Sequence, residues 1–281
     1  MIAYFILVHR YPEQFKRMFR AIHDPSNFYA VHVDRNSGPE FTKDIREFLR
    51  PYRNAEIIRA QGALWGGYSL VEAQLRGMKR LLEMDANWTH FINLSGQDFP
   101  LKSQAFIANF LKQNAGKEFI SVLDQAVVRP ETMDRIEYIY IELFGRIFET
   151  RIPRKFLKNA KPYVGTQWMI AGREFCEFVC NTQEVNRFKR YYRYTYIPDE
   201  SFFQTVMMNG APHGTIVSDD LRIVEWVPHN YMLRPRTLGI NDAVYLTSSD
   251  KLFARKFDMT HDSEIIDLLE RQIQMSTGSV K

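Results

Sequence analysis

Residues 1–34 read MIAYFILVHRYPEQFKRMFRAIHDPSNFYAVHVD, and this stretch decides the fold class. The apolar run Ile2 to Val8 predicts a buried strand, and Pro12 to Ile22 carries apolar residues at helical spacing. Tyr29 to Val33 predicts a second buried strand, which ends at Asp34. A strand, a helix and a strand in this order are typical of a parallel sheet with crossover helices.

The same alternation continues along the chain. We expect helices at 40–49, 69–84 and near Glu174 and Ser201, and strands at 56–58, 90–94, 167–171 and 221–226. No internal repeat and no Gly/Ser-rich linker interrupts this pattern. The sequence therefore predicts a single α/β domain over residues 1–281, with a mostly parallel central sheet flanked by helices.

The composition excludes several classes of protein. A hydrophobic fraction of 45% and a charged fraction of 25% are typical of a soluble globular domain, and a net charge of +4 is too small to indicate nucleic-acid binding. Cys176 and Cys180 are expected on one helix face, which excludes a disulfide framework, and no further ligands suggest zinc. Reduced thiols and the lack of a leader or a long apolar run favour the cytoplasm; peripheral association with the inner face of the membrane stays open.

Polar or aromatic residues follow several predicted strands. His9, Asp34, residues 65–67 and residues 95–98 all lie in loops after strands, where open α/β sheets bind ligands. We expect these loops to converge.

Five segments carry a resemblance: VHVDRNS at 31–37, LWGGYS at 64–69, FINLSGQDFP at 91–100, PDESFFQTV at 198–206 and LFARKFD at 252–258. In this order and spacing they resemble the core-2/I-branching enzyme and peptide O-xylosyltransferase family, also called glycosyltransferase family 14, most closely its xylosyltransferase branch and bacterial relatives. The resemblance implies a GT-A-like, Rossmann-related fold. It also implies transfer of a sugar, such as GlcNAc, xylose or another hexose or pentose, from a UDP-sugar to a glycan hydroxyl with inversion.

The resemblance also divides the domain. Residues 1–125 would form the nucleotide-sugar-binding half, with Val8, His9, Asp34 and Trp65 at the donor. Residues 126–281 would form the acceptor-side half. From the residues alone, Asp34 could instead form an Asx turn and Trp65 could mark a helix entry.

Glu200 is the candidate general base. Pro198 predicts a helix start, which would place Glu200 in the first turn of a helix that continues through Met207. A first-turn acid can also simply stabilise the helix dipole, although Ile197 excludes a capping box. The resemblance implies that Glu200 deprotonates the acceptor hydroxyl.

Arg255 and Lys256 are the candidate diphosphate ligands. We expect them on a short helix after Ser248 and Ser249, where they could simply form a solvated basic face. The resemblance implies instead that they contact the diphosphate of the leaving UDP. Asp98 stands alone where many GT-A enzymes carry Asp-x-Asp, and a turn before Pro100 explains it equally well. We therefore expect no metal and no cofactor.

Two further positions concern the substrates. Gln167, a candidate ligand of the donor sugar, stands where the xylosyltransferases carry Asp before Trp. If that Asp holds the donor sugar, a neutral Gln bonds differently, so the resemblance does not by itself imply UDP-xylose as the donor. Trp226, at the end of the strand expected at 221–226, matches a tryptophan near the acceptor, with core packing as the alternative.

Two other functions compete with transfer. A sugar-nucleotide pyrophosphorylase would need a Gly-rich phosphate loop, which residues 8–12 lack. A non-catalytic UDP- or glycan-binding module would not need Glu200. The preferred interpretation is a transferase of surface polysaccharide or glycoconjugate synthesis that acts on a glycan or lipid-linked glycan; the sequence does not indicate its oligomeric state.

Overall fold

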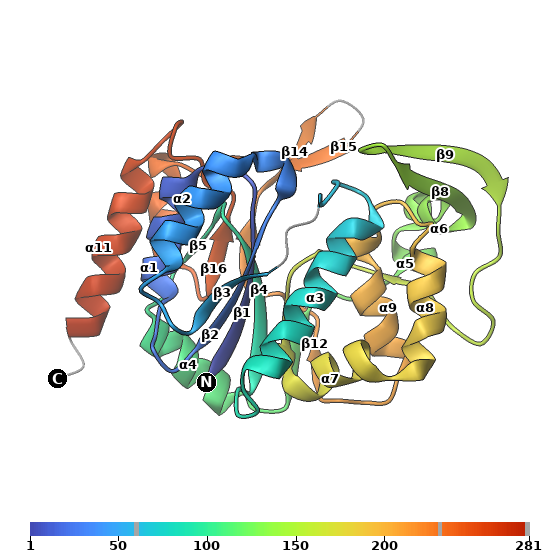
Figure 1. The fold of residues 1–281 in the computed structure, drawn as a ribbon, viewed down its shortest axis with the longest axis horizontal. Helices are drawn as coiled ribbons and strands as arrows, with labels where there is room; N and C mark the ends of the chain where they lie inside the picture. Colours follow the sequence, from blue (N-terminus) through green and yellow to red (C-terminus); the bar gives the residue numbers. More distant parts are fainter. Residues whose placement is uncertain (59–61, 230–231, 279–281) are drawn as a thin grey trace.

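The computed structural model describes residues 1–58, 62–229 and 232–278. A seven-stranded sheet with the order β12-β6-β11-β4-β1-β2-β3 forms the centre of a single α/β domain (Figure 1). β11 runs antiparallel to both of its neighbours, and all other adjacent pairs are parallel, which confirms the mostly parallel sheet. The strands are β1 (Ile2–Val8), β2 (Phe28–Val33), β3 (Ala55–Ile58), β4 (His90–Ser95), β6 (Lys117–Ile120), β11 (Met169–Gly172) and β12 (Thr215–Val217).

Helices cover both faces of the sheet because its strands are apolar on both sides. All residues of β1 are buried, and its alternate residues belong to two separate core clusters. The cluster of Tyr4 and Ile6 packs against α1 (Pro12–Ile22), α2 (Pro39–Leu49), α4 (Gln104–Gln113), α10 (Ala243–Ser248) and α11 (Glu264–Gly278). The cluster of Phe5 and Leu7 packs against α3 (Tyr68–Met84), α7 (Arg173–Asn181), α8 (Asn186–Tyr192) and α9 (Phe202–Asn209).

Smaller elements lie around this core. A second sheet has the order β13-β16-β5 and comprises β13 (Arg222–Val224), β16 (Phe253–Arg255) and β5 (Asp98–Pro100). The antiparallel pairs are β7 (Leu123–Asp124) with β10 (Tyr163–Val164), β8 (Tyr138–Leu143) with β9 (Arg146–Pro153), and β14 (Trp226–His229) with β15 (Met232–Pro235). The short helices are α5 (Gln125–Val128), α6 (Asp134–Glu137), η1 (Arg35–Ser37), η2 (Pro130–Thr132), η3 (Gln183–Val185), η4 (Pro198–Glu200) and η5 (Ile240–Asp242).

The predicted elements of the first half are confirmed, with ends that differ by at most one residue. The strand expected at 167–171 begins later, at Met169, and ends at Gly172. Cys176 and Cys180 share α7, where Cys176 is buried and Cys180 half-buried. No helix in the described ranges has the length and hydropathy needed to cross a bilayer.

The helix expected around Arg255 and Lys256 is wrong. Arg255 is the last residue of strand β16, paired with Asp98 of β5, and Lys256 follows the strand. The reason is burial on every side: Leu252, Phe253 and Ala254 are consecutive and fully buried, which suits a strand covered on both faces.

Two predictions around Glu200 and Trp226 are also corrected. Glu200 does not lie in the helix that contains Met207, because Ser201 at φ −141° separates η4 from α9. Leu221 has a φ of 54°, so β13 starts after it and ends at Val224, and Trp226 opens the next hairpin.

The strand order places the candidate site. β1 lies between β2 and β4, so the chain moves to one side of β1 and then returns to the other. In open α/β sheets the crevice at such a switch point, outside the carboxyl ends of the strands, binds ligands. Val8 and Ser95 end the two strands beside this crevice.

Candidate active site

Backbone bonds join the loops at the carboxyl ends of β1, β2 and β4. The amide of Asp34 donates to the carbonyl of Val8 over 2.9 Å, and the amide of Gly96 donates to the carbonyl of Leu7 over 2.8 Å. The hydroxyl of Ser37 donates to the carbonyl of His9 over 2.8 Å. The expected convergence is confirmed for the loops that carry His9, Asp34 and residues 95–98.

The side chain of Asp34 holds two backbone segments in place. Its Oδ1 accepts from the amide of Asn36 over 2.7 Å, which is the Asx turn considered from the sequence. Its Oδ2 accepts from the amide of Ala63 over 3.2 Å, so the carboxylate also fixes the loop that leads to Trp65. Each carboxylate oxygen can accept a second bond, which leaves room for a hydroxyl of a ligand.

Trp65 is exposed over 61% of its surface and meets the ring of Tyr196 edge-on, with centroids 6.1 Å apart. Next to it, Gly66 has a φ of +77°, and a Cβ there would lie 2.8 Å from the ring of Tyr196. Glycine therefore allows the close contact. The carbonyl of Gly66 accepts from the amide of Ile197 over 2.8 Å, which ties this loop to the segment that carries Glu200.

Glu200 lies between two of the predicted substrate segments. Its carbonyl accepts from the amide of Gly165 over 2.8 Å, which fixes the segment that leads to Gln167. Its Oε2 pairs with Nη1 of Arg135 over 3.0 Å, and its side chain is 29% exposed. Among the described residues no hydrogen bond reaches Oε1, so this oxygen can accept a proton from a bound hydroxyl.

The backbone before Glu200 is strained. Ile197 has a φ of 49° and a ψ of 52°, and a β-branched residue rarely adopts this left-handed conformation. Such residues concentrate at functional sites, where the surrounding bonds hold them in place. Here the bond from Ile197 to Gly66 serves that purpose.

Asp199, beside Glu200, is a buried carboxyl. Burial, followed by the charge of Glu200, raises its pKa to about 7, and the charge of Arg135 opposes this rise. Its Oδ1 has no hydrogen-bond partner in the described part of the chain. Two adjacent carboxyls with different environments are thus placed at the same end of α9.

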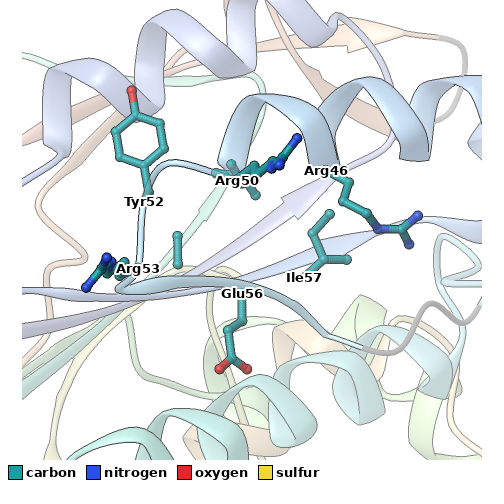
Figure 2. A pocket seen from close by; sticks show the side chains of 8 residues that line it. Arg46, Arg50, Tyr52, Arg53, Glu56 and Ile57 are labelled. Carbon is teal, nitrogen blue, oxygen red and sulfur yellow. The ribbon is translucent and has the colours of Figure 1, made fainter.

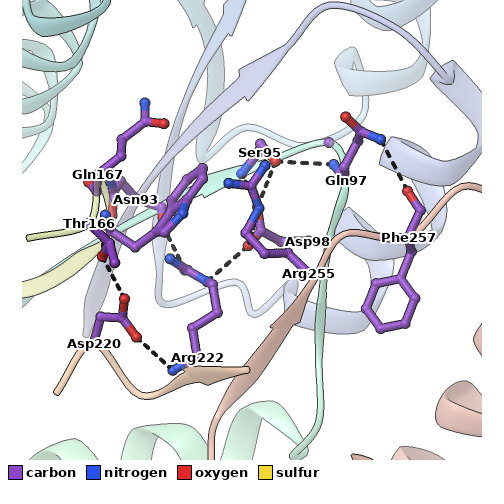
Figure 3. A network of polar contacts seen from close by, with 12 residues as sticks. Asn93, Ser95, Gln97, Asp98, Thr166, Gln167, Asp220, Arg222, Arg255 and Phe257 are labelled. Atoms are coloured by element: carbon purple, nitrogen blue, oxygen red, sulfur yellow. Dashed lines mark hydrogen bonds and ion pairs between the residues drawn. The ribbon is translucent and has the colours of Figure 1, made fainter. Parts of the chain in front are cut away.

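A buried ion-pair network occupies the place of the missing Asp-x-Asp motif (Figure 3). Asp98 is fully buried, and its Oδ1 lies 2.9 Å from Nε of Arg222 and 4.0 Å from Nε of Arg255. Its Oδ2 accepts from the amide and the hydroxyl of Ser95 over 2.7 and 2.6 Å. Asp98 therefore belongs to an internal ion-pair network in addition to the turn considered from the sequence.

Arg255 is held between this network and an aromatic face. Its guanidinium carbon lies 4.2 Å from the ring centroid of Trp168, and that of Arg222 lies 4.5 Å from the same ring. Burial lowers the pKa of Arg255 to about 10 against the opposing charge of Asp98, so the side chain stays charged at neutral pH. A fixed, partly desolvated cation of this kind suits a phosphate oxygen.

Lys256 lies among like charges. Partial burial lowers its pKa, the charges of Arg10, Arg255 and Arg234 lower it further, and Asp258 opposes them. Arg10 also donates to Nε2 of His9 over 2.7 Å. Cations held together favour a bound anion, so this cluster next to the end of β1 fits a diphosphate.

Gln167 is placed by its backbone. Its carbonyl accepts from Nδ2 of Asn93 over 2.8 Å, and Figure 3 shows its side chain directed away from the ion-pair network. The neighbouring Thr166 donates its hydroxyl to Asp220 over 2.6 Å. The Gln167 side chain is half-buried and is available to a ligand.

Trp226 is 42% exposed, so the core-packing alternative is wrong. It opens hairpin β14–β15, and β15 carries Arg234, one of the charges around Lys256.

A surface hollow elsewhere does not contain the site. It lies between the end of α2 and the start of β3, at the opposite end of the strands, and none of the predicted site residues lines it (Figure 2). Its lining includes Arg46, Arg50, Tyr52, Arg53, Glu56 and Ile57. In the described residues no group of three or more His, Cys, Asp or Glu side chains is arranged to hold a metal ion.

Sequence reasoning missed several residues of this site. Arg135 and Arg222 approach from segments without a recognised motif, and only the fold brings them to Glu200 and Asp98. Trp168 directly follows Gln167, so its position in the sequence could have identified it as a site residue.

Comparisons with known proteins agree with this architecture. The family model described as Core-2/I-Branching enzyme matches residues 2–246. Three curated relatives match 96% of this chain. The chain is 29% identical to xylosyltransferase 2 of Mus musculus and of Homo sapiens, and the match covers 33% of each of these proteins. It is 31% identical to xylosyltransferase 1 of Rattus norvegicus, and the match covers 35% of that protein. The chain thus spans about a third of the length of these curated relatives. The protein belongs to the core-2/I-branching enzyme family of glycosyltransferases.

Proposed function

We propose that this chain is an inverting, metal-independent glycosyltransferase that moves a sugar from a UDP-sugar to a hydroxyl of a glycan. The observation that carries the proposal is the position of Glu200. Backbone bonds connect its segment to the loop of Trp65 on one side and to the segment of Gln167 on the other. A carboxylate with one available oxygen therefore lies between two segments that we predict to bind the donor sugar.

The reaction is a single displacement. Oε1 of Glu200 takes the proton of the acceptor hydroxyl while that oxygen attacks the anomeric carbon of the donor. The bond from this carbon to the diphosphate oxygen breaks, and UDP leaves with the electron pair. A positioned base of this kind contributes about 100- to 10,000-fold to the rate.

Arg255 and Lys256 stabilise the leaving diphosphate in this proposal. The diphosphate is already anionic and gains a further negative charge as the bond breaks, while it faces fixed cations; Arg10 and Arg234 add to the same field. The Asp98–Arg222 pair and the ring of Trp168 hold Arg255 in place before the substrate binds. Preorganised charge of this kind can replace a divalent ion at the diphosphate.

The remaining residues bind the ends of the substrates. Val8, His9 and Asp34 line the end of β1 and β2, where the nucleoside would lie, and Trp65 offers an aromatic face to the donor sugar. Trp226 offers an exposed face to the acceptor. The acceptor would be a glycan, free or lipid-linked, at the cytoplasmic face of a membrane, in surface polysaccharide or glycoconjugate synthesis.

A donor screen tests the proposal. The chain is incubated in excess EDTA with UDP-xylose, UDP-GlcNAc, UDP-glucose or UDP-galactose, and UDP release is measured with and without simple glycan acceptors. We expect release from at least one donor, and no release from the Glu200→Gln variant. UDP binding without release from any donor, with metal absent or added, would instead favour the non-catalytic binding module.

A further inference from the structure

The turn of hairpin β8–β9 carries a residue that neither packing nor backbone conformation favours. Phe144 is 90% exposed, and its φ is 50°, followed by Gly145 at 70°. Two successive positive φ values are typical of a type I′ turn, in which Asn-Gly is the favoured pair. A bulky residue at positive φ is rare, so Phe144 costs conformational energy and gains no burial.

A strained and exposed residue of this kind indicates a contact with another molecule. Figure 1 shows the hairpin, in yellow-green, at the periphery of the molecule. Phe144 lies at its tip, between Leu143 of β8 and Arg146 of β9.

The inner face of the hairpin is attached to the candidate active site. Oε2 of Glu142 accepts from the amide of Ser69 over 3.1 Å, beside the loop of Trp65. The ring of Tyr140 stacks on the ring of Tyr196, with centroids 5.3 Å apart. The hairpin is therefore a fixed extension of the site and not an independent arm.

The outer face is apolar and open. Ile141 and Phe148 are directly opposite each other across the strands, so their side chains share one face, and Leu143 lies two residues beyond Ile141 on that face. These side chains are 40%, 47% and 48% exposed in that order. With Phe144 they form the outer patch of the hairpin.

Cations lie along the same hairpin and after it, with Arg146 next to the outer patch and Arg151 toward the other end of β9. Arg146 and Arg151 of β9, and Lys155 and Lys158 after it, are exposed, and in the described part of the chain none of them forms an ion pair. If two copies of the chain met at this surface, their cations would repel one another, which disfavours self-association. Anionic lipid headgroups complement both the charges and the projecting apolar tip.

We propose that hairpin β8–β9 docks the protein on an anionic lipid surface, with Phe144 inserted at the headgroup boundary and the four cations facing lipid phosphates. Docking would hold the Trp65 loop and Glu200 near a lipid-linked acceptor. Only that last consequence rests on the proposed function; the docking itself does not.

Co-sedimentation with vesicles tests the docking. Vesicles of phosphatidylcholine alone are compared with vesicles of equal parts phosphatidylcholine and phosphatidylglycerol. We expect binding to the mixed vesicles only, and a loss of binding at high salt. Phe144→Asn should weaken the partition by about tenfold or more because it removes the apolar anchor.

The same substitution controls for misfolding. Asparagine before Gly145 is favoured in this turn, so the Tm of Phe144→Asn should equal or exceed that of the unchanged protein. Val244→Ser removes an 81% exposed side chain on α10 and should leave vesicle binding unchanged. The double charge reversal Arg151→Glu with Lys155→Glu should abolish the preference for anionic vesicles.

Equal binding of Phe144→Asn and the unchanged protein would overturn the proposal, as would a Phe144-dependent dimer without vesicle binding. UDP release from a soluble donor is measured on the same samples without lipid. If the unchanged protein releases UDP but does not bind the mixed vesicles, this inference fails and the proposed function stands; if it binds the vesicles but releases no UDP, the reverse holds.

Discussion

Nη1 of Arg135 lies 3.0 Å from Oε2 of Glu200, and the two side chains are only 18% and 29% exposed. A partly buried pair of this kind fixes the orientation of the carboxylate, and within the described residues it leaves Oε1 without a hydrogen bond. The pair joins α6 to η4, two short helices that lie far apart in the sequence. Arg135 is thus a positioning residue for the proposed base.

Arg135→Leu should lower kcat by about tenfold or more and change KM for the donor little, because a free carboxylate samples unproductive orientations. Arg135→Lys should restore part of the loss. Steady-state kinetics on both variants measure this. Arg129→Leu is the control for loss of an exposed arginine, since within the described ranges Arg129 forms an ion pair only with Glu131. An unchanged kcat in Arg135→Leu would exclude the positioning role.

The central strands were predictable because their signals are local. β1 and α1 have the predicted bounds, since a buried strand and an amphipathic helix can both be read from residues close together in the sequence. The loops at the ends of these strands then converge by topology alone.

The second half was less predictable because tertiary contacts determine it. Arg255 lies in a strand because β5 and β13 pair with its segment, and no local pattern announces those partners. The contact of Arg135 with Glu200 likewise depends on the fold. The role of each motif residue toward a substrate stays a prediction, because the fold positions the residue without showing its ligand.

Asp199 should make stability depend on pH. Its folded pKa of about 7 lies above its ordinary value of 3.8, so the folded state holds the proton more tightly than the unfolded chain. This contribution is complete below the unfolded pKa and is lost as pH rises through the folded pKa.

Asparagine has no carboxyl to ionise, so Asp199→Asn should keep the stability that the unchanged protein loses as the pH rises. The Tm difference, variant minus unchanged protein, should be larger near pH 8 than near pH 5, by about 2 to 4 °C for each kcal/mol involved. Thermal unfolding followed by circular dichroism at both pH values measures it. A difference that stays constant between them would show that Asp199 does not titrate in this range.

Transfer should proceed without a divalent ion. We expect the same rate in excess EDTA as after addition of manganese or magnesium. Lys256→Ala, on the half-exposed side of the cluster, should cost about 2 to 4 kcal/mol of transition-state stabilisation if Lys256 contacts the diphosphate.

Arg255→Ala should cost a similar amount in catalysis and also destabilise the fold, because it leaves Asp98 with less compensation inside the protein. A rate that vanishes with EDTA and returns with metal would contradict the account, as would full activity in both alanine variants.

Gln167 should influence the choice of donor. A neutral amide bonds a sugar hydroxyl differently from a carboxylate, so strict use of UDP-xylose is not expected. Gln167→Asp should shift the ratio of kcat/KM values toward UDP-xylose. Competition between UDP-xylose and UDP-GlcNAc measures this ratio, and efficient use of UDP-xylose alone by the unchanged protein would show that the inference is wrong.

The most direct test of the central claim is a comparison of binding and turnover in Glu200→Gln. The substitution keeps the shape and the bond to Arg135 but removes the proton acceptor, so calorimetry should give a UDP affinity close to that of the unchanged protein. Transfer should fall by about 100- to 10,000-fold. A variant that binds UDP normally and keeps more than about a tenth of the turnover would contradict the assignment of Glu200 as the general base.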